Sequence, residues 1–291
     1  MRMAVWTVAV SAVRWISDNR DTVTRHIMRY EIGELVPYIN WPYFYFAWQL
    51  RDHEEQTRIR IEAENILSRL DGHYRVHGIV VIDNAASDGD DIIIGDVRIP
   101  MLRQQHAAGT AGHCLCLADF VRPASSGAKD SMGVFATTVD IGLETDFESD
   151  GYMKMMTRLL ADRLAEAAAE RLHEQVRKNL WGYAPDECLT IEEMHAERFA
   201  GIRPAVGYPS LPDTGINFII AGLIGMADIG IRLTESGAMK PHASVSGLII
   251  AHPAARYFSI GKIGEDQLRD YSMRRGVPLE MMRRFLAANV D

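Results

Sequence analysis

The sequence predicts an α+β domain built on a mostly antiparallel sheet. Segments rich in β-branched residues come in neighbouring pairs joined by turn-forming residues, which is the pattern of hairpins. Helical segments do not alternate strictly with these strands, as they would in a parallel α/β fold. With 291 residues, of which 47% are hydrophobic, the chain is also long enough to bury a substantial core.

The first half of the chain contributes one charged helix and three strands to this prediction. Ile59, Ile61 and Leu67 give the segment 52–70 a helical period and one apolar edge. The turn-prone residues 84–91 are expected to join two strands. Strands are predicted where Val, Ile, Thr and Phe concentrate, over 76–83, 92–99 and 132–141.

The second half is predicted to be richer in helix. Apolar residues at intervals of four or eight predict one long helix over 152–181. Thr190 with Glu193 fits a capping box that begins a short helix, and Gly201 fits its C-terminal stop. The apolar segment 216–231 is too short to span a membrane and predicts a core helix. The remaining elements are expected to be two strands and two helices, over 245–251, 256–263, 265–275 and 278–288.

Composition excludes several classes of protein. The net charge of −8 disfavours nucleic acid as a partner, because phosphate binding needs a basic surface. A charged fraction of 24% disfavours both disorder and a membrane-embedded protein. The three cysteines, Cys114, Cys116 and Cys188, make no disulfide framework, which fits a reducing compartment. We therefore expect a cytoplasmic protein with no membrane and no nucleic-acid partner.

Residues 1–27 are expected to be an N-terminal extension, followed by one domain over 28–291. The stretch 1–15 is apolar around Arg14 and short enough for the core of a signal peptide, so secretion is the alternative. An amphipathic extension or a start codon placed too early is the preferred interpretation, because Met28 begins a better-defined domain edge.

Most catalytic motifs are absent from the sequence. There is no GxSxG nucleophile elbow, no GxxxxGK[ST] phosphate loop and no GxGxxG motif opening a helix. Cys114 and Cys116 lie next to His113, but no second ligand pair stands at zinc spacing, so no metal site is expected. Two small buried thiols are the preferred interpretation.

One segment, Gly201–Pro209, carries candidate binding chemistry. Its two glycines and two prolines force an extended, turn-rich backbone whose N–H and C=O groups are expected to be free for a ligand. Arg203 can bind a carboxylate in bidentate fashion, and Tyr208 can stack on a planar ring. The alternative is a tight connector with a surface arginine.

The long predicted helix carries a row of carboxylates. Asp162, Glu166 and Glu170 are spaced four residues apart and share one face with His173. Such a row is usually a solvated surface, and it can also form an anionic wall for a cationic ligand. The spacing leaves both interpretations open.

Ordered blocks of the sequence closely resemble one known family. The longest blocks are RLLADRLAEAAAERLHEQVRKNLWGYAPDE (158–187), GIRPAVGYPSLPD (201–213), LTESGAMKPHASVSGL (233–248) and HPAARYFSIGKIGEDQLRDYSMRRG (252–276). Shorter blocks match in the same order: YINWPYFYFAWQL (38–50), GDDI (89–92), LRQQ (102–105) and CLADFV (116–121). Together they resemble the C-terminal activation domain of cobalamin-dependent methionine synthase, over residues 30 to 291.

The resemblance implies a single helmet-like α+β domain, with a twisted, mostly antiparallel sheet flanked by helices. It also implies that S-adenosyl-L-methionine binds in a shallow surface groove, where a carboxylate such as Glu166 or Glu197 would favour the cationic sulfonium. No side chain is expected to act as a catalytic acid or base. Cofactor-binding roles fall on the residues that match family motifs: Asn40, Glu166, Glu197, Arg203, Pro204, Ala205, Gly207, Tyr208, Tyr257 and Phe258.

One position departs from the family pattern. Asn40 stands where many members have an aspartate that binds the ammonium group of the ligand. The amide oxygen still accepts a hydrogen bond, but a charge-assisted bond contributes about 1–2 kcal/mol more than a neutral one. Weaker ligand binding is therefore expected.

The resemblance covers only one domain of a longer enzyme of methionine biosynthesis. The sequence has no homocysteine, methyltetrahydrofolate or cobalamin module and no DxHxxG motif to supply a cobalt ligand. The resemblance therefore implies a methyltransferase component, incomplete alone, that presents S-adenosyl-L-methionine to cobalamin on a corrinoid-binding methionine synthase subunit in trans. A flavodoxin-like protein would supply the electron for this reactivation. The alternative is a module that senses S-adenosyl-L-methionine or docks on a corrinoid protein without methyl transfer.

Overall fold

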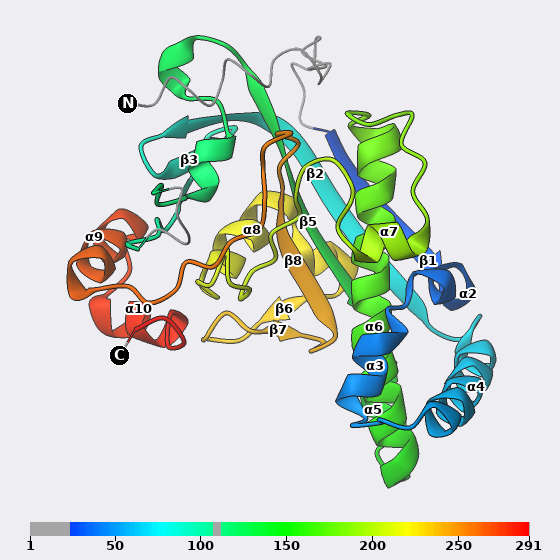
Figure 1. The fold of residues 1–291 in the computed structure, drawn as a ribbon. Helices are drawn as coiled ribbons and strands as arrows, with labels where there is room; N and C mark the ends of the chain where they lie inside the picture. The colour runs from blue at the N-terminus through cyan, green and yellow to red at the C-terminus, as the bar shows by residue number, and fades with distance from the viewer. Residues whose placement is uncertain (1–23, 107–111, 291) are drawn as a thin grey trace.

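Within residues 24–106 and 112–290, which the computed structural model describes, the core is a curled antiparallel sheet of six strands (Figure 1). The strand order is β4-β3-β2-β5-β8, and β1 pairs with β2. This arrangement confirms the predicted α+β class. The strands are β1 (Thr24–Glu31), β2 (Arg75–Asp88), β3 (Asp91–Ile94), β4 (Val97–Pro100), β5 (Asp130–Val139) and β8 (Ser244–Ile249).

Strand β2 organises the sheet because it is long enough to pair with β1, β3 and β5. The turn predicted over 84–91 is wrong, since the strand runs on to Asp88 and turns only at residues 89–90. The single strand predicted over 92–99 is also wrong. Gly95 has a left-handed φ of 55°, which permits a tight turn between β3 and β4.

One face of the sheet is covered by α6 (Gly151–Gln175), which continues into a π-helical turn, η4 (Val176–Leu180). The long helix predicted over 152–181 is therefore confirmed. Gly78 of β2 lets this helix pack close to the sheet, because a Cβ atom there would lie 2.9 Å from Cδ1 of Leu172. The buried side of α6 is rich in alanine and leucine, which suit such a close approach.

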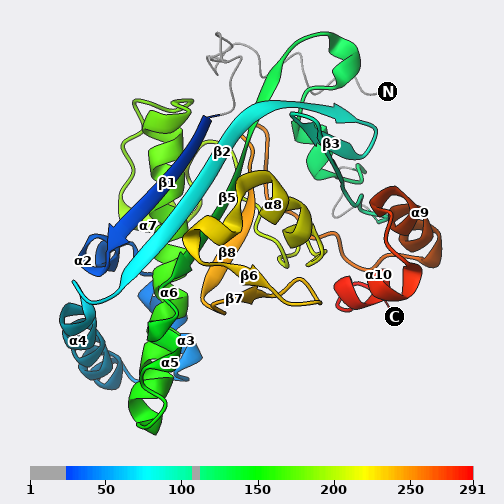
Figure 2. The same cartoon turned by 180° about the vertical axis from the view of Figure 1, so that it is seen from behind.

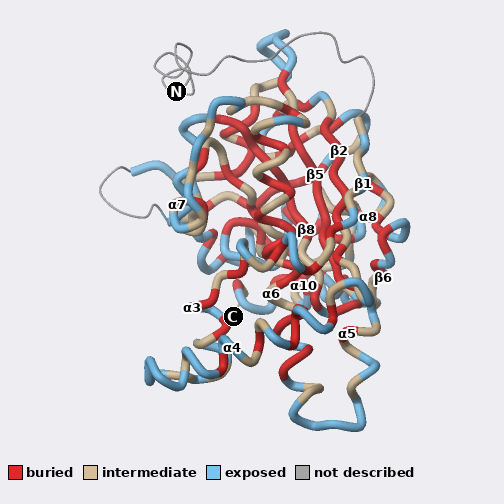
Figure 3. Tube along the Cα trace, turned by 90° about the vertical axis from the view of Figure 1, so that its right-hand side faces the viewer, coloured by how far each residue is buried: buried red, intermediate tan, exposed pale blue. Residues whose placement is uncertain are grey.

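The opposite face of the sheet is covered by α8, as Figures 1 and 2 show together. An apolar core fills the space between this helix and the strands, and Figure 3 shows the buried residues concentrated along the sheet. The core helix predicted over 216–231 ends early, because Gly225 has a left-handed φ of 72°. The elements on this face are α8 (Ile216–Ile224), η5 (Met226–Ile229), β6 (Arg232–Leu233) and β7 (Met239–Lys240).

Shorter elements surround the two layers. The predicted helices over 52–70 and 265–275 are confirmed, and the last helix is shorter than its predicted range, 278–288. The shorter elements beside α6 are α2 (Ile32–Leu35), η1 (Val36–Tyr38), α3 (Trp41–Ala47), α4 (His53–Leu70), α5 (Gly142–Thr145) and α7 (Ile191–His195). The others are η2 (Leu117–Phe120), η3 (Ala124–Ser126), α9 (Glu265–Arg275) and α10 (Leu279–Phe285).

Two local predictions are corrected by these elements. The segment 256–263 forms no strand in the described structure, because its backbone bonds to a neighbouring loop instead, as in the 2.9 Å bond from Ile260 N–H to the Pro209 carbonyl. Ile61 does not lie on the buried edge of α4, since 55% of its surface is exposed.

The N-terminal expectations fall largely outside the described residues. Residues 1–23 belong to that part of the chain, and Met28, expected at the domain edge, lies inside β1 opposite Gly78. Among the helices of residues 24–106 and 112–290, none combines the length and apolar character that a membrane span requires.

Candidate functional site

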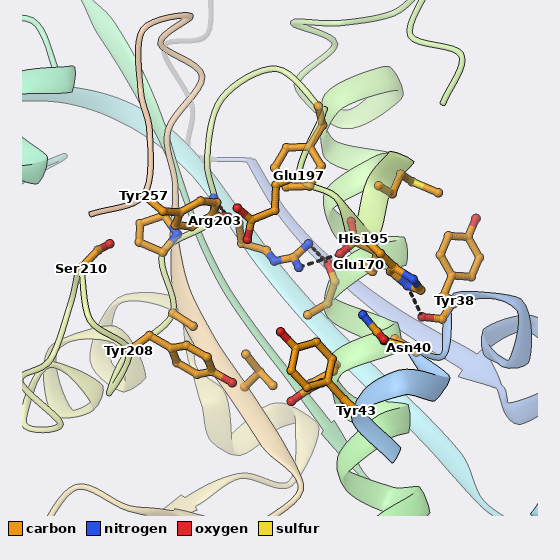
Figure 4. Close-up of a pocket in the computed structure, with 18 of the residues that line it drawn as sticks. Tyr38, Asn40, Tyr43, Glu170, His195, Glu197, Arg203, Tyr208, Ser210 and Tyr257 are labelled. Atoms are coloured by element: carbon orange, nitrogen blue, oxygen red, sulfur yellow. Dashed lines mark hydrogen bonds and ion pairs between the residues drawn. The ribbon is translucent and has the colours of Figure 1, made fainter. Parts of the chain in front are cut away.

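A surface groove of about 740 Å³ lies between α6 and the segment 203–210 (Figure 4). Its walls come from parts of the chain that are far apart in sequence. They are α6, the η1–α3 region, the end of α7 with the residues after it, the segment 203–210 and the pair 257–258. Val245 of β8 completes the lining, so the central sheet supports the groove.

The structure brings together the predicted cofactor-binding residues with one exception, Gly207. Gly207 instead forms the turn before Tyr208, with a φ of 87° and an N–H that donates to the Leu211 carbonyl at 2.8 Å. The predicted residues that line the groove are Asn40, Glu166, Glu197, Arg203, Pro204, Ala205, Tyr208, Tyr257 and Phe258.

The segment 202–206 is fixed to β8 rather than left unpaired, so the expectation of free backbone groups is wrong there. Leu248 N–H, for example, donates to the Pro204 carbonyl at 3.0 Å. Gly247 permits this approach, because a Cβ atom there would lie only 2.3 Å from the Pro204 carbonyl oxygen. The loop that carries Arg203 is therefore held by the edge of the sheet.

Arg203 extends from this loop to α6. Its guanidinium donates to the Ala169 carbonyl at 2.9 Å and to Glu170 Oε2 at 3.0 Å. Its own N–H donates to the Tyr257 hydroxyl oxygen at 2.9 Å. The side chains of Arg203 and Glu170 are only 15% and 10% exposed. Arg203 therefore fastens the loop to the helix at the inner wall of the groove.

Two residues of the carboxylate row on α6 lie in the wall of the groove. Glu166 and Glu170 line the groove, so a purely solvated surface is the wrong interpretation for them, whereas Asp162 is not among the described lining residues. Arg163 Nη1 donates to Glu166 Oε2 at 2.8 Å. Burial raises the pKa of Glu166, and Arg163 opposes this rise.

Glu197 enters the groove from a strained turn. It has a left-handed φ of 57°, which is uncommon for a residue with a side chain. α7 has already ended at His195, so the prediction that Gly201 stops this helix is wrong. Burial raises the pKa of Glu197. The nearby charge of Arg203 opposes this rise, but the Glu197 carboxylate forms no ion pair among the described residues and lines the groove.

Aromatic side chains flank the groove on both sides. Tyr208 and Tyr43 come from opposite walls and remain 54% and 61% exposed (Figure 4). Deeper in, Phe258 is held by Ser210, whose hydroxyl donates to the Phe258 carbonyl at 2.5 Å. Burial raises the pKa of Tyr208, and its ring offers a face for packing against a planar group.

Sequence reasoning assigned no role to several residues that line the groove. His195 is one of them: its Nε2 donates to the Tyr38 carbonyl at 3.1 Å and ties α7 to the segment that carries Asn40. Only its position two residues before Glu197 hinted at this wall. The other lining residues to which the sequence assigned no role are Tyr38, Tyr43, Arg163, Ala167, Ala169, Met194, Phe199, Pro209, Ser210 and Val245.

The cysteines lie outside the groove. Cys116 is buried as expected, and burial raises its pKa to about 12. Cys114 is only half-buried, so the expectation of two buried thiols is wrong for it. Within residues 24–106 and 112–290, no three His, Cys, Asp or Glu side chains form a group that could hold a metal ion.

Comparisons with known proteins agree with this geometry. Residues 31–276 match the family model described as "Vitamin B12 dependent methionine synthase, activation domain". Among solved structures, the chain is similar to one described as "Crystal Structure of the MetH Reactivation Domain bound to AdoHcy", with 38% sequence identity and a TM-score of 0.87. That match covers 92% of this chain and 90% of the solved chain.

Proposed function

This chain belongs to the family of the vitamin B12-dependent methionine synthase activation domain, and from that premise we propose that its groove binds S-adenosylmethionine and presents the methyl group to cobalamin. The observation that carries the proposal is the groove itself, which joins free and paired carboxylates, a fixed arginine and aromatic rings in about 740 Å³. A structural relative was crystallised with AdoHcy, the demethylated form of the same ligand.

Each wall of the groove suits one part of S-adenosylmethionine. Glu166 and Glu197 offer negative charge to the sulfonium, and Asn40 offers an acceptor to the ammonium group. Arg203 supports the wall that meets the carboxylate end of the ligand. The adenine ring would pack among the aromatic residues Tyr208, Tyr257 and Phe258, next to Pro204 and Ala205.

The chemistry needs no side-chain acid or base. An external one-electron donor, a flavodoxin-like protein, reduces cob(II)alamin to cob(I)alamin, whose cobalt electron pair attacks the sulfonium methyl carbon. The carbon–sulfur bond breaks, its electrons stay on sulfur, and AdoHcy and methylcobalamin are the products. The groove contributes orientation and proximity, which are large effects when a donor is already activated.

We further propose that the cobalamin is carried by a separate corrinoid-binding methionine synthase polypeptide. An exposed aromatic rim beside the groove supports this: Tyr43 and Phe46 of α3 are 61% and 83% exposed, and Tyr208 faces Tyr43 across the groove. Apolar rings at the edge of a ligand groove suit docking of a partner that brings a large macrocycle.

The alternative function is sensing of S-adenosylmethionine, or docking on a corrinoid protein, without methyl transfer. Two observations favour it: Asn40 lacks a charge, and Glu166 is already paired with Arg163. Both features lower the attraction of the groove for a ligand with two cationic groups.

Two variants test binding and docking separately. In isothermal titration, Tyr208→Ala should weaken S-adenosylmethionine binding by about tenfold, on the scale of a lost aromatic packing contact. Phe46→Ala, which does not line the groove, should leave this affinity unchanged and slow methyl transfer to the corrinoid protein. Absence of S-adenosylmethionine binding by the wild-type chain would contradict the proposal outright.

A further inference from the structure

A second ion pair, Arg177 with Glu187, lies buried behind the groove. Arg177 belongs to the π-helical turn that continues α6, and none of its side-chain surface is exposed. Its Nε donates to Glu187 Oε2 at 2.7 Å, and the Glu187 side chain is 12% exposed.

This pair is poorly explained by stability alone. Nη1 and Nη2 of Arg177 are buried and have no hydrogen-bond partner among the described residues. A buried ion pair often contributes no more stability than apolar residues of the same volume, because both charges lose their hydration. Retaining an incompletely satisfied arginine here therefore points to a positional role.

The pair holds the chain just after Glu197 from two directions. The Arg177 guanidinium lies over the Phe199 ring, with 4.7 Å between its Cζ and the ring centroid. Glu187 Oε1 accepts from the Ala200 N–H at 3.3 Å. The Phe199 ring also packs against the His173 ring in a T-shaped arrangement, with 4.7 Å between the ring centroids.

Holding this segment has a direct consequence for Glu197. A left-handed backbone is unfavourable for a non-glycine residue and persists only when its surroundings fix it. The bond from Glu197 N–H to the Met194 carbonyl, at 2.9 Å, fixes one side of that residue. The contacts to Phe199 and Ala200 fix the other side.

We propose that Arg177 and Glu187 are positioning residues that hold the Glu197 carboxylate toward the ligand, and so set the preference of the groove for a cationic sulfonium over a neutral thioether. This inference rests on the proposed binding of S-adenosylmethionine. It differs from a general stabilising role, because a loosened groove would lose affinity for both ligands equally.

The test compares S-adenosylmethionine with AdoHcy, which differ at the charged sulfur. The double variant Arg177→Met/Glu187→Gln removes both buried charges together, so neither is left unpaired. In this variant the dissociation constant of AdoHcy, divided by that of S-adenosylmethionine, should fall by about tenfold. A change of this size corresponds to the loss of one charge-assisted contact. Glu197→Gln should lower the ratio equally, and the triple variant should lower it no further.

A second variant covers the case in which the double variant does not fold. Arg177→Lys keeps the charge but cannot lie flat over Phe199, and it should lower the same ratio. The control, Arg198→Gln, changes a charge that is 67% exposed and should leave the ratio unchanged.

The inference is overturned if folded Arg177 variants keep the wild-type ratio of dissociation constants, or if they bind both ligands more weakly by the same factor. It is also overturned if the ratio in the triple variant falls by the product of the decreases seen in the double variant and in Glu197→Gln. A wild-type chain that binds neither ligand would instead contradict the proposed function.

Discussion

Arg203 and Glu170 form a buried ion pair across the inner wall of the groove, with 3.0 Å between Nη2 and Oε2. Arg203→Gln would leave the Glu170 charge buried and unpaired. We expect the free energy of unfolding to fall by about 3 kcal/mol and the dissociation constant of S-adenosylmethionine to rise at least tenfold. Denaturant unfolding and isothermal titration measure the two effects.

The matched control for this prediction is the double variant Glu170→Gln/Arg203→Gln. It should recover part of the stability, because no lone buried charge remains, without recovering ligand binding. Equal affinity in the wild type and Arg203→Gln would remove Arg203 from the binding site.

Asn40→Asp should strengthen binding. A carboxylate facing the ligand ammonium adds about 1–2 kcal/mol over the amide, which lowers the dissociation constant roughly tenfold. Methylthioadenosine carries no ammonium group, so its affinity should not improve. If affinity rose equally for both ligands, Asn40 would not contact the ammonium group. Asn40→Ala is the reference variant, because it removes the amide without adding a charge.

Gly247→Ala should damage the loop that carries Arg203. The added methyl group would lie 2.3 Å from the Pro204 carbonyl oxygen, so the loop must move away from β8. We expect a loss of about 1–3 kcal/mol in unfolding free energy, as for other overpacked sites, and weaker binding.

Gly222→Ala is the control for that substitution. A Cβ atom at this α8 position has nothing within 4 Å, and alanine favours helix, so stability should be unchanged or slightly higher. Retention of wild-type stability by Gly247→Ala would show that the loop does not depend on its contact with β8.

Because His173 is buried, we expect the stability of the protein to fall at acidic pH. His173 is fully buried, and burial, followed by the charges of Arg203 and Arg177, lowers its pKa well below the usual 6.5. Below pH 6.5, His173 therefore binds a proton in the unfolded chain but stays neutral in the folded chain. Stability should fall as the pH drops below this value, by up to about 1.4 kcal/mol per pH unit.

His173→Gln isolates this contribution. The variant keeps a polar side chain but cannot titrate, so its unfolding free energy should change less between pH 7 and 5.5 than that of the wild type. Parallel pH profiles for the two proteins would show that His173 does not carry the effect.

The order and type of the main elements could be predicted because periodicity reports them directly. The long α6 and the capping box of α7 are examples, since helical spacing and the Thr190–Glu193 pair are local properties. The turn predicted over 84–91 is wrong because residues 84–88 continue β2 and pair with β5 and β3, a long-range pairing that local turn propensity does not report.

The site was predictable only where family motifs mark it. Glu170 was visible as part of a helical row, but spacing could not show that Arg203 would neutralise it inside the groove. His195 and Phe199 carry no motif; His195 is held on the wall by its bond to Tyr38, and Phe199 follows the left-handed turn at Glu197. Such contacts depend on tertiary packing, which local sequence patterns do not encode.

Methyl transfer in trans is the most direct measurement of the central claim. The chain is mixed with a cob(II)alamin-loaded corrinoid protein of methionine synthase, a reduced flavodoxin and S-adenosylmethionine labelled in its methyl group. We expect the methylcobalamin spectrum, the label on cobalamin and an equal amount of AdoHcy only when all four components are present. Ligand binding without any labelled methylcobalamin, or the same rate of its formation without this chain, would contradict the account.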